Sequence, residues 1–256
     1  MSTSEAHKVT KLARKTMLKL ENVSKVYYGK SHVGRDDNND SRLFLEHVVL
    51  NNLNLSIGEG EFITIVGRSG CGKSTLFNIV SGVDRSYIGV IQIDGKPQST
   101  NIDRIIIFQE AVLFPWLTVY ENVEFGLKAA KLPKNKRRDI VMHYIELVQL
   151  TNFANTFIHW LSGGMKQKVA IARALVLDPK ILLMDEPFAA LDIQTRTILY
   201  NQLLQTYERT NKTILFVTHN INEAVALGDR VIVMYPLLAN VWKEFTVDLP
   251  SPDPDN

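Results

Sequence analysis

The sequence predicts an α/β domain in which helices cover a mostly parallel β-sheet. Short apolar runs rich in β-branched residues alternate with segments of helical length along much of the chain, and this alternation is typical of a parallel sheet with crossover helices. A glycine-rich loop, GRSGCGKST at residues 67–75, stands between one such run and a predicted helix. Another run, ILLM at residues 181–184, is followed at once by two carboxylates, as expected where a strand buried on both faces ends.

The predicted elements follow one another in a regular order. The early runs, MLKLENV and VVLNNLNLSI, alternate apolar and polar residues, so we expect them to form an antiparallel flank. The remaining predicted strands are EFITIVG, GVIQID, RIIIF, ILLMDE, TILFVTH and RVIVMY. The predicted helices span residues 73–81, 135–150, 163–177, 192–210 and 221–227.

Length and composition indicate one large globular domain. The 256 residues, 45% of them hydrophobic, can bury a full core. A net charge of +2 gives no support for a nucleic-acid partner. The single cysteine, Cys71, excludes an internal disulfide and fits a reducing compartment. The apolar run at 231–242 is shorter than the roughly 20 residues that span a bilayer, so we expect the chain to act at a membrane only as a peripheral protein.

Three segments depart from the regular pattern. Residues 1–16 are basic, and we expect a disordered tail ahead of a domain at 17–256. Residues 28–42 are polar and rich in Gly, Asn and Asp, which predicts a surface loop. Residues 109–161 lack strands and predict a helical subdomain inserted between core segments 17–108 and 162–256. The subdomain carries basic residues that we interpret as a solvated face, namely Lys131, Lys134, Lys136, Arg137 and Arg138.

The glycine-rich loop predicts a binding site for a nucleoside triphosphate. It satisfies G-x-x-x-x-G-K-[ST] in the strand-to-helix context that gives the pattern its meaning. Backbone N–H groups and the helix N-terminus form a nest for polyphosphate, Lys73 adds a cation for the β- and γ-phosphates, and Ser74 offers a hydroxyl to Mg²⁺. An ordinary glycine-rich turn explains neither side chain. The expected contacts are Gly67, Arg68, Ser69, Gly70, Cys71, Gly72, Lys73, Ser74 and Thr75, and nucleotide should protect the Cys71 thiol from modification.

The two carboxylates after ILLM predict a metal ligand and a water-positioning group. The carboxyl ends of strands in open α/β sheets are where ligands bind. Asp185 can therefore hold Mg²⁺ through water, and Glu186 can orient the water that attacks the γ-phosphate. Acidic residues end many strands, so the prediction depends on the phosphate loop being present in the same chain.

The segment LSGGMKQ, at residues 161–167, carries a family resemblance. Ser162 is a plausible N-cap for the following helix, yet an N-cap does not require two consecutive glycines. With the phosphate loop and ILLMDEP, this segment makes the chain resemble the nucleotide-binding subunit of ABC transporters, and LSGGMKQ is similar to their signature motif. The resemblance covers residues 17–250, with the motifs in the family's order. It implies a P-loop NTPase fold with an ABC-type RecA-like core, an antiparallel β flank and an inserted helical subdomain.

The resemblance implies roles for further residues. Tyr27 matches the aromatic residue that stacks on adenine, although an outward strand tyrosine is as good an interpretation from the sequence alone. Gln109 matches the glutamine that contacts Mg²⁺ or the attacking water and connects to the membrane partner. Asp192, in AALD, matches the D-loop, and His219 matches the switch histidine at the γ-phosphate.

The resemblance also implies partners. In the family two chains pack head to tail, so that Ser162, Gly163 and Gly164 of one chain enclose the ATP on the phosphate loop of the other. Such dimers lie on the cytoplasmic face of a membrane permease, and a separate solute-binding protein delivers the solute. The chain would then be an ATPase that couples hydrolysis to import.

A finer resemblance, to the nitrate, sulfonate and taurine importers, comes from LFPWLTVYENVEFGLK at 113–128 and from the tail KEFTVDLPSP at 243–252. Trp160, Asn220 and the polar loop at 28–42 depart from the family pattern, and none of these departures removes a catalytic group. Phe114 and Trp116 are either contacts for the permease or core residues of the helical subdomain.

We therefore expect an ATP-hydrolysing subunit of an importer for a small anion. One alternative is a soluble ABC ATPase outside transport, but neither coiled-coil heptads nor an internal repeat is present in the sequence. Another is a nucleotide-binding module without turnover, against which Lys73, Asp185, Glu186 and His219 all argue. The solute itself is not encoded in this chain.

Overall fold

The computed structural model describes residues 14–30, 44–98, 103–189, 193–210, 212–235 and 240–248. The polar loop predicted at 28–42 lies mostly outside these ranges, as does Asp192 of AALD. At the N-terminal end, β1 (Thr16–Lys30) begins inside the segment predicted as a tail, and Arg14 already binds Asp229. The folded chain therefore starts earlier than predicted.

Two sheets form the body of the molecule. The first is antiparallel and contains β1, β2 (Phe44–Gly58), β4 (Ile88–Ile93) and β5 (Lys96–Pro97) in the order β2-β1-β4-β5. The second has the order β10-β9-β3-β8-β7-β6. Its strands are β3 (Phe62–Gly67), β6 (Arg104–Ile107), β7 (Ile181–Asp185), β8 (Thr213–Thr218), β9 (Arg230–Tyr235) and β10 (Asn240–Thr246). All of these pair in parallel except β10, which is antiparallel to β9.

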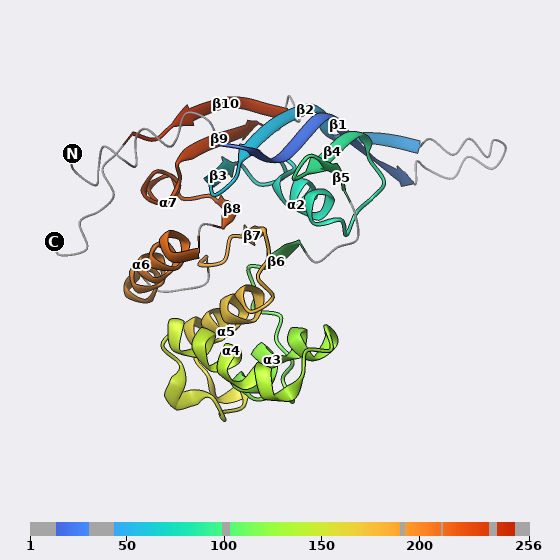
Figure 1. Ribbon diagram of the computed structural model, residues 1–256. Coiled ribbons are helices and arrows are strands. Elements are labelled where there is room, and N and C mark those ends of the chain that lie inside the picture. The colour runs from blue at the N-terminus through green and yellow to red at the C-terminus, as the bar shows by residue number, and fades with distance from the viewer. Residues whose placement is uncertain are drawn as a thin grey trace, which may run out of the picture.

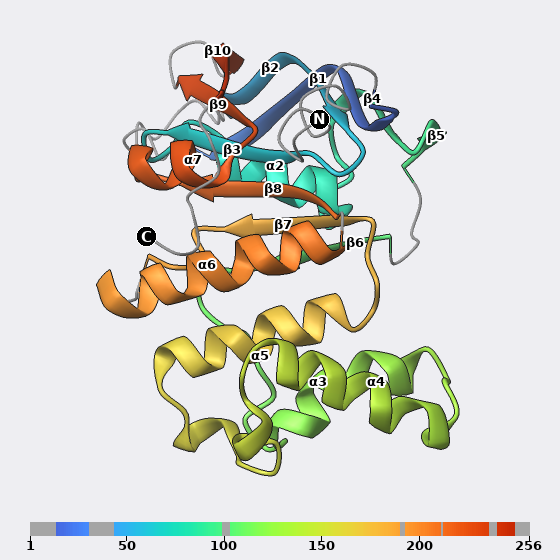
Figure 2. The ribbon, with the colours of Figure 1, turned by 60° about the vertical axis from the view of Figure 1, so that its left-hand side comes forward.

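Helices cover both faces of the parallel sheet (Figure 1). They are α2 (Lys73–Ser81), α3 (Val119–Ala129), α4 (Lys134–Leu147), α5 (Gly163–Leu175), α6 (Ile193–Thr210) and α7 (Ile221–Leu227), with short 3-10 turns η2 (Thr151–Phe153) and η3 (Ile158–Trp160). Figure 2 shows α2 between the two sheets, and α6, α5, α3 and α4 on the opposite side of the parallel sheet.

Alternation along the strands divides the core into two parts. Ile63 and Ile65 point toward α2 and the antiparallel sheet, where they join one buried cluster. Phe62 and Phe216 point the other way and join the cluster formed with α3, α4, α5 and α6. Because successive side chains of a strand face opposite sides, a strand buried on both faces must be apolar at nearly every position. This explains why the strands of the parallel sheet are almost uniformly apolar in the sequence.

The largest differences from the predicted strands concern β1 and β10. β1 extends well past the predicted MLKLENV, because β2 pairs with it as far as Lys30. The pairing contains several register shifts, and each shift breaks the alternation by which a strand is recognised in sequence. β10 was not predicted as a strand, since it is a partly exposed edge strand without an apolar run.

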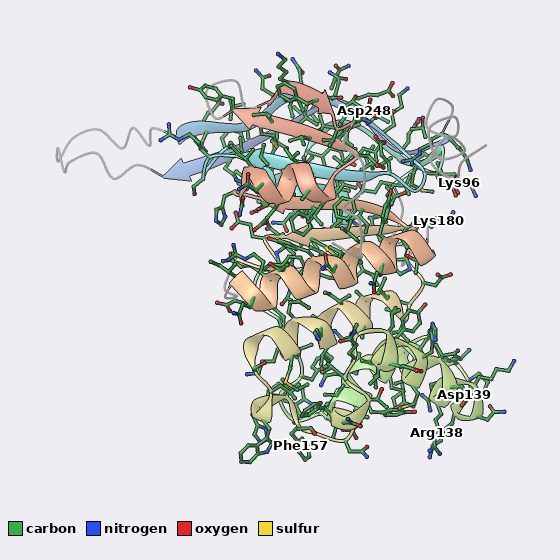
Figure 3. The ribbon with its side chains drawn as sticks, turned by 90° about the vertical axis from the view of Figure 1, so that its left-hand side faces the viewer. Lys96, Arg138, Asp139, Phe157, Lys180 and Asp248 are labelled. Atoms are coloured by element: carbon green, nitrogen blue, oxygen red, sulfur yellow. The ribbon has the colours of Figure 1, made fainter. Side chains whose placement is uncertain are left out.

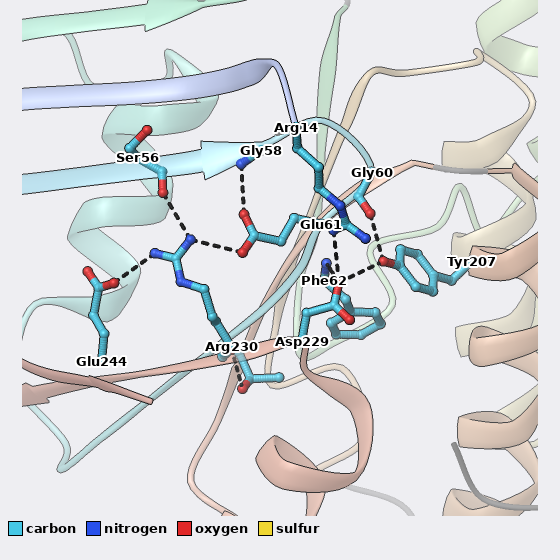
Figure 4. Close-up of polar contacts among 11 residues, drawn as sticks. Arg14, Ser56, Gly58, Gly60, Glu61, Phe62, Tyr207, Asp229, Arg230 and Glu244 are labelled. Carbon is cyan, nitrogen blue, oxygen red and sulfur yellow. Dashed lines mark hydrogen bonds and ion pairs between the residues drawn. The ribbon is translucent and has the colours of Figure 1, made fainter. Parts of the chain in front are cut away.

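Charged side chains form hydrogen bonds and ion pairs at the end of the parallel sheet where β3 and β9 begin (Figure 4). The Asp229 carboxylate accepts hydrogen bonds from Arg14 Nη1 at 3.0 Å, Tyr207 Oη at 3.1 Å and the Phe62 amide at 3.3 Å. Next to it, Arg230 binds Glu61 at 2.9 Å and Glu244 at 2.8 Å. Residues far apart in sequence thus hold the N-terminal segment, α6 and β10 at the end of the sheet opposite the phosphate loop.

The predicted helical subdomain contains α3, α4 and the two 3-10 turns. Thr118 caps α3 with a capping box to Glu121. Of the basic cluster, Arg138 projects from α4 away from the rest of the molecule (Figure 3), as a solvated face requires. Arg137 differs, because it is half-buried and pairs with the buried Glu124 at 3.2 Å. One member of the predicted solvated cluster therefore has a structural role.

Candidate functional site

The phosphate loop connects β3 to α2 through glycines that no other residue could replace without strain. Gly70 and Gly72 have φ angles of 79° and 96°, in the left-handed region. A Cβ on Gly72 would lie 2.8 Å from the Val49 carbonyl oxygen, and one on Gly67 would lie 2.6 Å from the Met234 carbonyl oxygen. At these two glycines the backbone of the loop therefore packs directly against β2 and β9. The loop also lines a cavity.

A cavity of about 550 Å³ opens above this loop. Its floor is the loop and the first turn of α2, and its wall includes side chains from β2, from the end of β7 and from the end of β8. Its lining residues are His47, Val49, Gly67, Ser69, Gly70, Gly72, Lys73, Ser74, Thr75, Glu186 and His219. Sequence motifs far apart in the chain are therefore brought to one site.

Lys73 supplies the positive charge of the site. Its ammonium group donates hydrogen bonds to the carbonyl oxygens of Gly67 at 2.7 Å and Arg68 at 3.1 Å. The side chain is buried within the loop, so these carbonyls hold the cation where an anion on the loop would lie. A lysine with only a packing role would not need to line the cavity.

Ser74 and Asp185 form the oxygen-rich part of the site. The Ser74 hydroxyl donates to Asp185 Oδ2 at 3.0 Å, which joins α2 to the carboxyl end of β7. Burial raises the pKa of Asp185 above its usual range, and the charge of Glu186 adds to this, whereas the Ser74 hydrogen bond and Lys73 lower it. The raised pKa indicates a carboxylate with less counter-charge than its burial requires. Hydroxyl and carboxylate oxygens are ligands that Mg²⁺ prefers.

Glu186 and His219 meet at the far wall of the cavity. Glu186 Oε2 lies 3.0 Å from His219 Nδ1, although the two residues follow different strands. The Glu186 amide donates to the Val217 carbonyl at 3.0 Å, and its φ of 45° turns the chain sharply after β7. The carboxylate can therefore accept a proton or orient water, with the histidine as its hydrogen-bonding partner.

The remaining predicted site residues lie outside the cavity lining. Tyr27 is half exposed, with its hydroxyl 3.4 Å from Asp84 and its ring over the Lys25 ammonium. Its cross-strand neighbour His47 does line the cavity. Gln109 is exposed directly after β6. Arg68 is also exposed and, in this structure, contributes its backbone carbonyl to Lys73.

The signature segment begins α5. The Ser162 hydroxyl accepts a hydrogen bond from the Met165 amide at 3.3 Å, so the predicted N-cap is confirmed. Ser162 and Gly163 are exposed, Gly164 is buried, and the described lining of this chain's own cavity includes none of them. The α5 N-terminus therefore presents its first amides to the outside of the molecule.

Sequence reasoning missed two groups of residues. His47 and Val49 reach the cavity only because β2 packs behind the phosphate loop, and no motif marks them. A second, mainly apolar cavity of about 350 Å³ lies between β6, α3 and α5. Its lining includes Leu113, Phe114 and Phe125 of the segment LFPWLTVYENVEFGLK, and also Val112, Arg173 and Leu177, which no sequence motif marks. Arg173 Nη2 also donates to the Val112 carbonyl at 2.5 Å.

The placement of Cys71 corrects one expectation. Its side chain is 1% exposed and belongs to the core under α2, not to the cavity lining. A Cβ on Gly67 would lie 2.6 Å from Cys71 Sγ, so the thiol packs under the loop. Protection of the thiol by nucleotide therefore loses its basis, because the folded protein already buries it.

We expect maleimide to modify Cys71 negligibly in the folded protein, with or without MgATP. The thiol has to be solvent-accessible before its thiolate can react. Mass spectrometry after a timed incubation measures the modified fraction, and protein denatured in urea should label fully. Rapid labelling of folded protein that MgATP slows would contradict the buried placement.

Comparisons with known proteins agree with this geometry. A family model described as ABC transporter matches residues 50–189. The chain is 45% identical to the nitrate import ATP-binding protein NrtD of Synechocystis sp., covering 80% of this chain and 77% of that protein. It is 41% identical to the taurine import ATP-binding protein TauB of Pelagibacter ubique, covering 79% and 77%. The dimeric ATP-binding cassette MJ0796, solved in a post-hydrolysis state with ADP and Pi, matches with a TM-score of 0.75 and 34% identity over 91% of this chain and 100% of that one. The chain therefore belongs to the ABC transporter family and is an ATPase of that family.

Proposed function

We propose that this chain is the energy-coupling subunit of an ABC importer that takes up a small anion such as nitrate, a sulfonate or taurine. The observation that supports hydrolysis is the convergence of Lys73, Glu186 and His219 on one cavity above the phosphate loop. The names of its relatives NrtD and TauB support import and the class of solute. ATP is the substrate of the site.

The residues of the site have different proposed roles in ATP hydrolysis. Lys73 neutralises charge that develops on the transferred phosphoryl group. Glu186 orients a water molecule and accepts its proton, and His219 holds the carboxylate through the 3.0 Å contact. Ser74 and Asp185 would hold Mg²⁺, because the half-buried Asp185 carboxylate has little counter-charge around it and is a suitable ligand. A bound Mg²⁺ supplies positive charge to the β- and γ-phosphates. Gln109 is proposed as a further ligand or water contact.

We propose that two copies of the chain form the working unit. The exposed α5 N-terminus, with Ser162 and Gly163, is an anion-binding element that faces away from its own cavity. Placed over a second copy's phosphate loop, it would complete that copy's site. We also propose that Tyr27 stacks on the adenine ring and that Asp192, in the segment similar to the D-loop, contributes to nucleotide binding. The similar cassette MJ0796 is dimeric, which supports the pairing of two copies.

The second cavity is the proposed contact for the permease. Phe108 and Glu110, which flank Gln109, both line it. With Gln109 in its proposed role at the nucleotide, the segment after β6 would connect the two sites. Side chains of α3 and α5 form hydrogen bonds with the segment. The buried Asn122 bonds the Phe114 amide at 2.9 Å and its carbonyl at 3.1 Å, and Gln167 of the signature segment bonds the Phe108 carbonyl at 3.4 Å.

No helix in the described parts of the chain has the length and apolarity to cross a membrane. We propose that the chain lies on the cytoplasmic face of the membrane through its permease. Purification of the tagged chain from detergent-solubilised membranes, followed by mass spectrometry, tests this. An associated permease, with a solute-binding protein from the same system, is the expected result. Recovery of the chain in stable form without any membrane protein would favour a soluble ABC ATPase outside transport.

Trp116 is expected to act in coupling, not in the core. The structure leaves 69% of its surface exposed, with its ring 5.6 Å from that of the half-buried Phe114, so Trp116 is not a core residue. Trp116→Ala should leave the melting temperature and basal ATPase rate of the isolated chain unchanged. In the assembled transporter it should reduce solute-stimulated hydrolysis and uptake about tenfold or more, as for an aromatic anchor at an interface.

Phe153→Ala is a matched control. Phe153 is also an exposed aromatic residue of the helical subdomain, but it lies in η2, whereas Trp116 packs against Phe114, which lines the second cavity. It should leave uptake unchanged. Normal uptake in Trp116→Ala, or an equal loss in both variants, would contradict the coupling role.

A further inference from the structure

A buried carboxylate lies directly behind the turn that carries His219. Glu223, in the first turn of α7, is 7% exposed. Its Oε2 accepts a hydrogen bond from the Thr218 hydroxyl at 2.5 Å, and its Oε1 lies 3.4 Å from Arg196 Nη1. A buried carboxylate is costly without such partners. The hydrolysis steps described above make no use of this group.

Glu223 fixes the turn through the Thr218 hydroxyl. That hydroxyl has a single proton, which it donates to Glu223, and its oxygen accepts a hydrogen bond from the Asn220 amide at 3.0 Å. Asn220 Oδ1 in turn accepts from the amides of Asn222 at 2.9 Å and Glu223 at 3.4 Å. The residues on both sides of His219 are therefore bonded, directly or through one hydroxyl, to the same carboxylate.

Helix α6 supports both members of the Glu186–His219 pair. Through Arg196 it contacts Glu223, and hence the turn that carries His219. One turn further along, the Tyr200 ring packs edge-on against Phe188 with centroids 5.2 Å apart, and Phe188 follows Glu186 by two residues. Burial, and then the neighbouring Glu223 carboxylate, raises the pKa of the Tyr200 phenol. A single helix thus lies behind both catalytic candidates.

We infer that the Arg196–Glu223 ion pair is a positioning pair for ATP hydrolysis, which sets the His219 ring at contact distance from Glu186. This inference rests on the proposed role of His219. The simpler interpretation is that Glu223 only stabilises the start of α7, as acidic residues in a first helical turn do. The two interpretations differ in what they predict, because loss of helix stability lowers the melting temperature, whereas loss of position lowers kcat in protein that stays folded.

Two substitutions separate these interpretations. Glu223→Gln keeps an oxygen that can accept the Thr218 proton but removes the charge that binds Arg196, and Arg196→Met removes the cation. Each should lower kcat about ten- to a hundredfold, the loss expected when a reacting group is misplaced by about 1 Å, with the KM for ATP and the melting temperature nearly unchanged. Arg196→Lys should recover most of the lost rate, since it restores the cation.

Glu61→Gln is the matched control. Glu61 is also a 7% exposed glutamate paired with an arginine, at 2.9 Å from Arg230, but at the opposite end of the sheet. It should leave kcat unchanged, whatever its effect on stability. A fall in kcat that follows the fraction of unfolded protein, or normal turnover in Arg196→Met, would overturn the inference.

A double-mutant cycle with His219 tests whether Glu223 affects kcat by positioning His219. If Glu223 acts through His219, Glu223→Gln should lower kcat little further in a His219→Ala background. Multiplicative losses would show a separate effect and overturn the inference while leaving the proposed function intact. Full turnover in His219→Ala alone would instead remove the histidine's proposed role, and the inference with it.

Discussion

Glu186→Gln is expected to lower kcat for ATP hydrolysis by about 10²- to 10⁴-fold, the usual contribution of a positioned general base. The substitution keeps the size of the side chain and its hydrogen bond to His219 at 3.0 Å. It removes the negative charge that orients water and accepts its proton. Lys73 and the loop are untouched, so ATP should still bind. A dimer held together by unhydrolysed ATP should accumulate, which size-exclusion chromatography with and without MgATP measures.

Glu59→Gln serves as the control for that substitution, because Glu59 is an exposed glutamate in the turn before β3. It should hydrolyse ATP normally and show no ATP-dependent dimer. Turnover in Glu186→Gln equal to that of this control would exclude Glu186 as the base.

Lys73→Ala is expected to weaken ATP binding by about ten- to a hundredfold. The ammonium group bonds two loop carbonyls and faces the cavity, and hydrogen bonds to a charged group contribute about 1.5–3 kcal/mol. Fluorescent-nucleotide titration or calorimetry measures the affinity. The melting temperature of the nucleotide-free protein should fall only modestly, because two carbonyls lose a partner.

Lys180→Ala is a suitable comparison, since Lys180 is an exposed lysine that pairs with Asp94 on the surface. Its affinity for ATP should not change. Equal affinities in Lys73→Ala and Lys180→Ala would contradict the assignment of the phosphate loop.

The parts of the site that could be predicted from the sequence are those fixed by local backbone chemistry. Three closely spaced glycines, Lys73 and Ser74 specify the loop between β3 and α2 by themselves. The position of Asp185 also followed, because β7 is buried on both faces and the carboxyl ends of parallel strands share one edge of the sheet. The 3.0 Å contact between Ser74 and Asp185, 111 residues apart in sequence, agrees with that reasoning.

What the sequence could not predict depends on packing between distant segments. The direction of the Cys71 side chain is set by the left-handed glycines on either side of it and by the space beneath α2. His47 reaches the cavity through the β1–β2 pairing, whose register shifts carry no sequence signal. The Arg196–Glu223 pair joins two helices that no periodicity relates. Such contacts arise only when the whole fold is assembled.

A mixed dimer provides the most direct test of the claim that each ATP site is shared between two chains. One chain carries Lys73→Ala and the other Ser162→Arg, both in a Glu186→Gln background so that ATP is retained without turnover. In a head-to-tail dimer both lesions fall in one composite site and the second site is intact. Isolated mixed dimers should therefore retain ATP through gel filtration, whereas neither parent homodimer should. Failure of verified mixed dimers to retain more ATP than either parent would contradict a shared site.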